Sequence, residues 1–342
     1  MRCLVFVEPH RLEWQEAPDP VLEDDVSALV RPVAVTTCDL DGPTIRGETP
    51  LAMLAPFAFG HEFIAEVVAV GEAVRSVAVG QRVCVPFQIS CGACARCRAG
   101  LTGSCGAVPP RSMFGFPTPV GGVWGGALAD LVRVPFADAM LVPVPQQIAP
   151  SAIASLSDNL PDAWRTVAPH LRAMPGGEVL IVAGSAHSIA LYAAAMAVAL
   201  GAGTVDFIDR DADRLRLAQR LGANPIEGPP PQRAGRYAIT VDASADADGL
   251  ACALRSLAPG GVCTSVGIYY GNMTPLPLLD MFGTGVHFHT GRANARADIP
   301  AVLELIADER LRPELINSET VAWDDAADAL RDPSMKPVFV RG

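Results

Sequence analysis

The sequence predicts an α/β protein with two domains, a β-rich domain that carries a metal-binding lobe and a doubly wound parallel sheet. Three observations point to this fold class. The length of 342 residues suits two domains better than one ordinary domain. Residues 1–150 contain short runs of Val, Ile and Leu bounded by Gly and Pro, which is typical of strands. Beyond them, strand-like and helix-like patterns alternate, as in parallel sheets with crossover helices.

The β-rich part is expected to contain short strands separated by glycine-rich loops. The apolar runs FIAEVVAVG, RVCVPF and LADLVRVP indicate strands within residues 63–71, 82–87 and 128–135. Glycines around Gly115 and within residues 121–126 interrupt this pattern and indicate loops.

The alternating part predicts a parallel sheet covered by helices. The expected strands cover residues 179–184, 205–209, 238–244 and 262–267, and the expected helices cover residues 188–201, 212–223 and 247–261. A further helix over residues 297–311 and a terminal strand over residues 337–342 follow.

Charge and hydropathy restrict the class of protein. The formal net charge of -11 argues against nucleic acid and anionic membranes as partners, because both need a basic surface. The first apolar run is broken by Glu8 and Pro9, so we expect neither a signal peptide nor a membrane-spanning helix there. The later run LYAAAMAVAL is also too short to cross a bilayer. We therefore expect a cytoplasmic protein of enzyme size.

Four cysteines form the strongest motif of the chain. Their spacing, C-x2-C-x2-C-x7-C, allows four thiolates to converge on one tetrahedral ion, which is how proteins often hold structural zinc. Two disulfides are disfavoured in a reducing compartment, and an iron–sulfur cluster is the other alternative. The motif therefore predicts a structural zinc lobe over residues 88–108, with Cys91, Cys94, Cys97 and Cys105 as ligands.

A second set of residues has the chemistry of a catalytic metal site. Cys38, His61 and Asp158 offer a thiolate, an imidazole and a carboxylate, which can bind zinc and leave a fourth position open. Glu62 follows the histidine and is expected behind the ligands. Each residue alone is ordinary, since a cysteine is usually core and a Ser-Asp pair commonly caps a helix. Asp162 competes with Asp158 as the carboxylate ligand.

The order of these motifs resembles the zinc-dependent medium-chain dehydrogenase/reductase family. The resemblance covers essentially the full chain, including GGALADLVRVP and the terminal PVFVRG. It is closest to the formaldehyde-dehydrogenase-like branch, whose third zinc ligand is the Asp of an LSD motif. It implies a GroES-like catalytic domain over residues 1–150 and 291–342 and a Rossmann domain over residues 151–290, with the active site between them. It also implies that Cys38, His61 and Asp158 hold a catalytic zinc.

The chain departs from the family pattern where the alcohol proton is usually relayed. The family has Ser or Thr two residues after the ligand cysteine, whereas this chain has Leu40. Asp41 keeps the usual acidic residue, but Pro43 stands near the position of a common histidine. The usual hydroxyl-to-histidine path is therefore expected to be absent.

The dinucleotide turn after the strand at residues 179–184 lacks most of the glycines of the usual Rossmann pattern. A Rossmann turn needs small residues so that the backbone can approach the pyrophosphate. Gly184 remains, and we expect Ser185, Ser188 and Ile189 beside it to contact the cofactor, although the register is ambiguous. His187 is either a solvent-facing loop residue or a contact to phosphate or substrate.

The end of the next strand predicts the cofactor. Asp209 stands where an acidic residue binds the adenosine ribose, and its charge would repel a 2′-phosphate. NAD is therefore favoured over NADP. NADP stays the alternative because of Arg210, since an arginine at that position can accommodate the 2′-phosphate.

Three functions are compatible with these features. The first is an NAD-dependent zinc alcohol dehydrogenase or carbonyl reductase, with two zinc ions per chain, a small alcohol or carbonyl substrate and a homodimeric or homotetrameric assembly. The second is a redox-neutral zinc Lewis-acid enzyme whose cofactor site is lost or repurposed. The third is a metal-stabilised scaffold without activity, which has no need of an open site. Phe114, Trp124 and Trp164 are expected to line an apolar substrate cavity.

Overall fold

The computed structural model describes residues 1–271 and 273–342 and divides the chain into two compact units. The first unit comprises residues 1–161, 294–309 and 313–342, and the second comprises residues 162–293 and 310–312. The predicted fold class is confirmed, because the first unit is rich in strands and the second contains a parallel sheet with helices. Among the described residues, no helix combines the length and the apolar character that crossing a bilayer requires.

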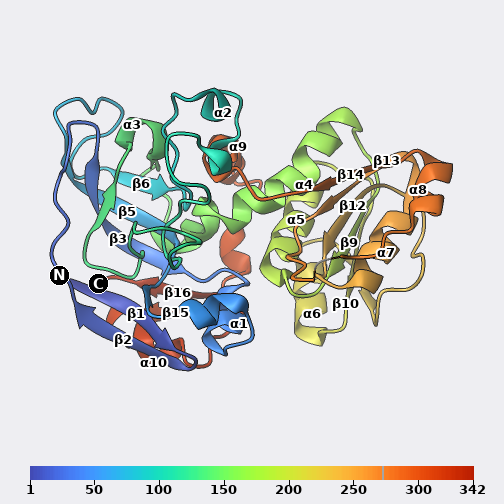
Figure 1. Ribbon diagram of the computed structural model, residues 1–342. Coiled ribbons are helices and arrows are strands. Elements are labelled where there is room, and N and C mark those ends of the chain that lie inside the picture. The colour runs from blue at the N-terminus through green and yellow to red at the C-terminus, as the bar shows by residue number, and fades with distance from the viewer. Residues whose placement is uncertain (272) are drawn as a thin grey trace. The chain divides into compact units, whose positions relative to one another are not determined.

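Two sheets form the first unit (Figure 1). The smaller has the order β2-β1-β4, with β1 (Arg2–Glu8), β2 (Arg11–Glu16) and β4 (Phe57–Ala58). The larger has the order β15-β16-β3-β5-β6-β8, with β7 also paired to β3. Its strands are β3 (Ala28–Thr36), β5 (Glu62–Val70), β6 (Arg82–Val85), β7 (Val132–Val134), β8 (Val142–Pro143), β15 (Glu319–Ala322) and β16 (Pro337–Val340). Because β16 pairs antiparallel with β3, the end of the chain returns to the unit that begins it.

Short helices connect these strands. They are α1 (Asp41–Ile45), η1 (Pro50–Leu54), α2 (Ala95–Arg98), η2 (Thr102–Ser104), α3 (Ala137–Met140), η3 (Pro150–Ser157), α9 (Ala295–Ala307), η4 (Pro313–Leu315), η5 (Trp323–Asp325) and α10 (Ala326–Ala329). The apolar faces of the strands enclose one core, in which the Phe63 and Phe114 rings meet edge to face at 5.8 Å. Phe114 is fully buried within this core.

The second unit is a six-stranded parallel sheet of order β11-β10-β9-β12-β13-β14. Its strands are β9 (Val179–Ala183), β10 (Val205–Asp209), β11 (Asn224–Glu227), β12 (Tyr237–Ala243), β13 (Leu257–Ser265) and β14 (His287–Thr290). Its helices are α5 (His187–Ala199), α6 (Ala212–Arg220), α7 (Ala247–Arg255) and α8 (Leu278–Thr284), while α4 (Asn159–Ala173) carries the boundary between the units. In Figure 1, α5 lies on one side of the sheet and α7 on the other.

The sequence pattern explains most of these elements, but not β11. The helix α5 is buried on almost every side, which agrees with its continuous run of apolar residues. Asp211 and Asp246 cap α6 and α7 by accepting hydrogen bonds from backbone N–H groups. The strand β11 consists of Asn, Pro, Ile and Glu, which are all exposed. No apolar run in the sequence therefore predicts this strand.

Gly115 lies where two loops of the first unit come close together. Its φ is +69°, and a Cβ atom would lie 2.3 Å from the carbonyl oxygen of Gly60. That contact is shorter than any tolerated approach, so only glycine fits. Gly60 directly precedes His61, and the close approach of the loops therefore helps to fix the backbone beside that histidine.

We expect Gly115→Ala to destabilise the protein more than Gly80→Ala. Gly80 has a similar φ of +85°, but a methyl group added there would have nothing within 4 Å, so its substitution isolates the cost of backbone strain. That cost is about 1–2 kcal/mol, and overpacking at Gly115 should add about 1–3 kcal/mol. Urea unfolding of both variants measures the difference. Equal unfolding free energies for the two variants would show that the loop around Gly115 can move to accommodate the methyl group without a free-energy cost.

Candidate metal centres and dinucleotide site

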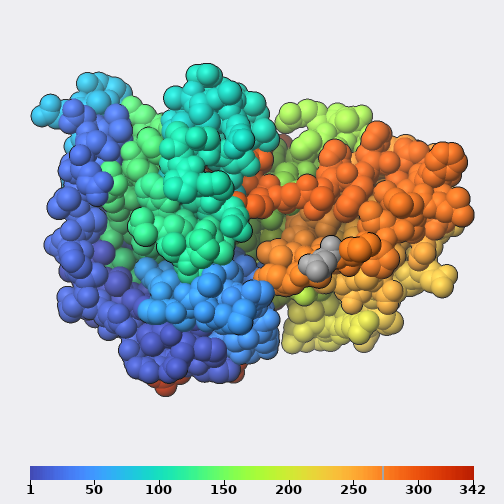
Figure 2. Space-filling view, viewed as in Figure 1, coloured from blue at the N-terminus to red at the C-terminus, as the bar shows by residue number. Residues whose placement is uncertain are grey.

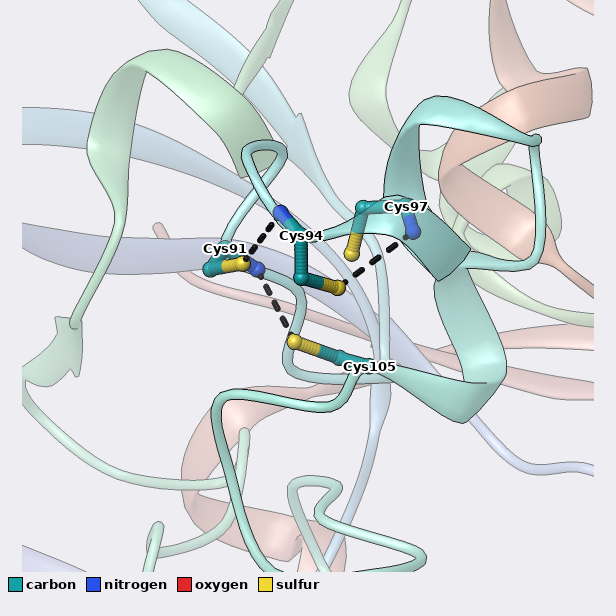
Figure 3. A group of neighbouring side chains, drawn as sticks. All are labelled: Cys91, Cys94, Cys97 and Cys105. Carbon is teal, nitrogen blue, oxygen red and sulfur yellow. Dashed lines mark hydrogen bonds between the residues drawn. The ribbon is translucent and has the colours of Figure 1, made fainter.

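The four cysteines of the predicted zinc lobe converge in the first unit (Figure 3). Cys91, Cys94, Cys97 and Cys105 are free thiols, and their sulfur atoms all lie within 4.8 Å of one another. Sulfur ligands at 2.3 Å from a tetrahedral zinc ion are separated by roughly 3.8 Å, so the arrangement fits such an ion.

Backbone N–H groups in this lobe favour the thiolate form. Cys94 caps the N-terminus of α2, and its sulfur accepts hydrogen bonds from the N–H groups of Cys97 at 3.5 Å and Gly106 at 3.4 Å. These hydrogen bonds lower the pKa of Cys94 to about 6. The Cys105 sulfur accepts similar bonds from the N–H groups of Cys91 and Ala107, both at 3.4 Å. Burial raises the pKa of Cys97, so the preference for the thiolate form holds for Cys94 and not for all four cysteines.

The candidate catalytic residues also converge in the first unit. One ligand atom from each of Cys38, His61, Glu62 and Asp158 lies within 4.8 Å of the others. His61 Nε2 is 3.4 Å from Asp158 Oδ2, yet neither ring nitrogen of His61 has a hydrogen-bond partner among the described residues. Two ligands at 2.0–2.2 Å from a tetrahedral zinc ion are separated by roughly 3.3–3.5 Å. The spacing and the unbonded nitrogens therefore fit a shared metal ion.

Strand pairing brings these residues together. Thr36, at the end of β3, is opposite Glu62, at the start of β5, so Cys38 and His61 lie at the same end of the antiparallel pair. Ser157 closes η3, and its hydroxyl oxygen accepts a hydrogen bond from the Phe63 N–H at 2.6 Å. That bond holds the next residue, Asp158, beside the histidine.

Asp162, the competing carboxylate, has another role. Its carboxylate forms an ion pair with Arg165 at 2.5 Å within α4. The geometry thus favours Asp158 over Asp162 as a ligand.

A buried carboxylate supports the candidate ligands from behind. Asp41 Oδ2 accepts a hydrogen bond from the Cys38 N–H at 2.8 Å, and Asp41 Oδ1 lies 3.9 Å from His61 Nδ1. Burial raises the pKa of Asp41 and of the Cys38 thiol. Burial lowers the pKa of His61, but the carboxylates of Asp41, Asp158 and Glu62 outweigh it and raise that pKa to about 9. A cation bound among these groups would favour their ionised forms and offset the cost of burying them.

Sequence reasoning missed three side chains at this site. The Phe116 and Phe87 rings lie 4.8 Å and 5.7 Å from the His61 ring. No sequence pattern marked these two aromatics. Lys336 is fully buried, with its ammonium 3.1 Å from Glu62 Oε2. A signal for it existed, because it is the only lysine in the chain.

The other two aromatic residues expected in the substrate cavity belong to different units. Trp164 is buried in the second unit, and Trp124 is partly buried against the core of the first. Leu40 contributes no hydroxyl, and its N–H donates to the Cys38 sulfur at 3.3 Å.

The predicted dinucleotide turn follows β9 in the second unit. A Cβ atom on Gly184 would lie 2.7 Å from the carbonyl oxygen of Ser244, which explains why this glycine remains. The N–H of Ser185 donates to that same oxygen at 3.2 Å. Ser185 is exposed, whereas Ser188 and Ile189 are buried in the first turn of α5. Ser185 is therefore the accessible hydroxyl beside the turn.

Asp209 lies at the end of β10 and is almost fully buried. Its carboxylate accepts hydrogen bonds from the N–H groups of Arg210 at 2.7 Å and Asp211 at 3.1 Å. Arg214, in the first turn of α6, donates to both carboxylate oxygens at 2.7 Å. Sequence reasoning missed Arg214, although its place five residues after Asp209 on the next helix was visible. Arg210 itself is exposed.

Comparison with known proteins places these sites in a family. Residues 24–146 match the family model described as an alcohol dehydrogenase GroES-like domain, and residues 188–308 match the one described as a zinc-binding dehydrogenase. A probable zinc-binding alcohol dehydrogenase of Mycobacterium tuberculosis is 31% identical over 96% of this chain and 84% of its own length.

One further relative and one solved structure support the same family. A glutathione-independent formaldehyde dehydrogenase of Pseudomonas aeruginosa is 34% identical over 65% of this chain and 57% of its own. The structure of an alcohol dehydrogenase from Thermus sp. ATN1 matches with a TM-score of 0.87 and 30% identity over 100% of both chains. None of these findings favours a redox-neutral activity. The chain belongs to the zinc-dependent medium-chain dehydrogenase/reductase family and is a zinc-dependent oxidoreductase.

Proposed function

We propose that this chain transfers hydride between NAD(H) and a small alcohol or carbonyl compound, with a catalytic zinc held by Cys38, His61 and Asp158 and a structural zinc held by the four-cysteine lobe. The observation that carries the proposal is the convergence of a thiol, an imidazole and a carboxylate around unbonded histidine nitrogens. When bound there, zinc supplies Lewis-acid polarisation of the substrate oxygen.

The chain's own residues orient the ligands and shape the site. Asp41 fixes the Cys38 backbone and lies beside the second nitrogen of His61, as supporting carboxylates do at zinc sites. Phe87 and Phe116 flank the His61 ring with apolar surface, which limits water and favours an apolar substrate group. Leu40 offers no hydroxyl, so the alcohol proton leaves without the usual relay at that position.

Replacement of Asp158 tests the metal site against its neighbour Asp162. We expect Asp158→Asn to lower kcat/KM for alcohols by at least about a hundredfold and to reduce zinc content from two ions per chain to one. Asp162→Asn should retain both ions and activity within about threefold, because its partner is Arg165. Elemental analysis and steady-state kinetics measure both. Loss of zinc in Asp162→Asn alone would reverse the assignment.

For the cofactor we propose NAD rather than NADP. Asp209 places a buried carboxylate at the end of β10, where the adenosine ribose lies in dinucleotide-binding sheets. Arg214 and two backbone N–H groups hold the carboxylate in a single orientation. A fixed carboxylate can accept hydrogen bonds from the ribose hydroxyl groups and repels a 2′-phosphate.

Calorimetric titration with NADH and NADPH tests this preference. We expect NADH to bind more tightly by at least tenfold, which corresponds to about 1.4 kcal/mol. Asp209→Ser should weaken NADH binding and reduce the discrimination. Asp213→Asn is the matched control, because Asp213 is an exposed carboxylate of the helix that follows. Tighter binding of NADPH to the unmodified protein would assign the site to NADP.

We also propose a homodimer, or a homotetramer built from such dimers, formed through the end of the second unit's sheet. The strand β14 ends the strand order among the described residues. The helix α8 contacts the neighbouring strand β13, and its Leu278, Leu279 and Phe282 expose 65%, 84% and 86% of their surface. The α8 segment forms part of the orange surface in Figure 2. Two copies related by a twofold axis would cover these apolar side chains and pair the edge strands.

Sedimentation of Phe282→Arg tests the assembly. We expect the charge to shift the protein toward monomers, because a buried unpaired arginine at the twofold interface is costly. Met53→Arg is the control, since Met53 is also an exposed apolar residue, 81% exposed, but belongs to the first unit. If both variants sediment as the unmodified protein does, the dimer does not use this surface.

A further inference from the structure

Lys336 is a chemically unique residue at the candidate catalytic site. The chain has 26 Lys and Arg residues in total, and Lys336 is the only lysine among them. Lysine is rarely fully buried unless it is paired. Lys336 immediately precedes β16 and has no exposed surface, and its partner Glu62 has none either. The single lysine of the chain is therefore fully buried, although removing an ammonium group from water is costly.

Three acceptors surround the Lys336 ammonium. Its nitrogen donates to Glu62 Oε1 at 3.2 Å, to Glu62 Oε2 at 3.1 Å and to the carbonyl oxygen of Thr37. An ammonium group has three protons, so these contacts can satisfy all of them. Glu62 follows His61 and Thr37 precedes Cys38 in sequence. One side chain thus ties together the backbone segments that carry two candidate metal ligands.

Glu62 is itself close enough to compete for the metal. A carboxylate oxygen of Glu62 lies within 4.8 Å of the candidate ligand atoms of Cys38, His61 and Asp158. A buried carboxylate needs a cation or hydrogen-bond donors, because desolvation of an unpaired charge is costly. The Lys336 ammonium contacts both oxygens of this carboxylate, and a metal ion bound by the candidate ligands would be a second cation beside it. Without the ammonium, the carboxylate would turn to the metal.

We propose that Lys336 is a positioning residue that holds the Glu62 carboxylate away from the catalytic metal, so that the metal keeps an open position for substrate. This inference rests on the proposed function, since it assumes a metal at Cys38, His61 and Asp158. It adds that the open position depends on a residue 274 positions away in sequence from Glu62.

The choice of lysine fits this role. Arginine is a planar fork that suits two parallel bonds to one carboxylate, whereas an ammonium is compact and directs three protons to separate acceptors. Here the acceptors are two carboxylate oxygens and a backbone carbonyl. Lys336→Arg is therefore expected to disturb the site, although it keeps the charge.

Azide binding to the cobalt-loaded protein tests the proposal without measuring activity. Azide should change the visible spectrum of cobalt only at a site with an open position, so the closed four-cysteine site does not interfere. We expect Lys336→Met to weaken azide binding by at least tenfold, and Lys336→Met with Glu62→Gln to restore most of it. Arg341→Met is the control, because Arg341 is a paired cation of the same terminal segment and bonds to Asp130.

The outcomes distinguish a failure of the proposed metal site from a failure of the proposed role of Lys336. If the unmodified protein loads cobalt but azide leaves its spectrum unchanged, the open metal site fails, and the inference fails with it. If azide binds the unmodified protein and Lys336→Met equally well, the metal site stands and the role of Lys336 is overturned. A double variant that binds azide as weakly as Lys336→Met also overturns it, because the Glu62 carboxylate would then not be the group that closes the open position.

A measurement on the native side chain covers the case in which Lys336→Met does not fold. Labelling with ¹³C-lysine gives one side-chain signal, because the chain has one lysine. We expect that signal to shift when zinc fills the catalytic site, and to stay unchanged on zinc addition in Asp158→Asn. A signal that does not respond to zinc in the unmodified protein would overturn the proposal.

Discussion

The concentration of negative groups beside His61 is the constraint on which the first unit's structure depends. Glu62 and Asp41 are buried beside His61, and Cys38 and Asp158 are half-buried next to it. Desolvated charges of one sign are costly unless cations or hydrogen-bond donors compensate them. Burial raises the pKa of Glu62, and the Lys336 ammonium beside it opposes that rise. A divalent cation held by the thiol, the imidazole and the Asp158 carboxylate would relieve this cost.

The antiparallel pairing around β3 assembles this charge cluster. The strand β5 brings His61 and Glu62 to one side of β3, and β16 brings the region after Lys336 to the other. The segment that ends η3 closes the group through the Ser157 hydroxyl. Each contributor comes from a different part of the chain, so a change in strand register would separate the ligands from the ammonium. The stability of the sheet and the geometry of the site are therefore linked.

In the second unit, the residues proposed to bind the cofactor lie at the ends of parallel strands. Its parallel strands end at one edge of the sheet, where the turn at Gly184 lies against the backbone of Ser244. That close approach explains why one glycine persists in an otherwise eroded turn. Asp209 lies at the end of the neighbouring strand, fixed by Arg214. The family membership of the chain agrees with a dinucleotide role for this edge, even though the glycine motif alone is weak.

The order of amino acids alone was enough for the fold class and the family, and it named the residues that converge at both candidate metal sites. Cysteine spacing is local, and strand–helix alternation follows from hydrophobic periodicity. Both can therefore be recognised from the sequence alone. The folded chain was needed to favour Asp158 over Asp162, to bury Phe114 in the core, and to reveal Phe116, Arg214 and the contacts of Lys336. These depend on which strands pair and which side chains lose water together. Such long-range contacts leave no periodic trace in the chain, because burial and charge pairing are properties of the folded interior.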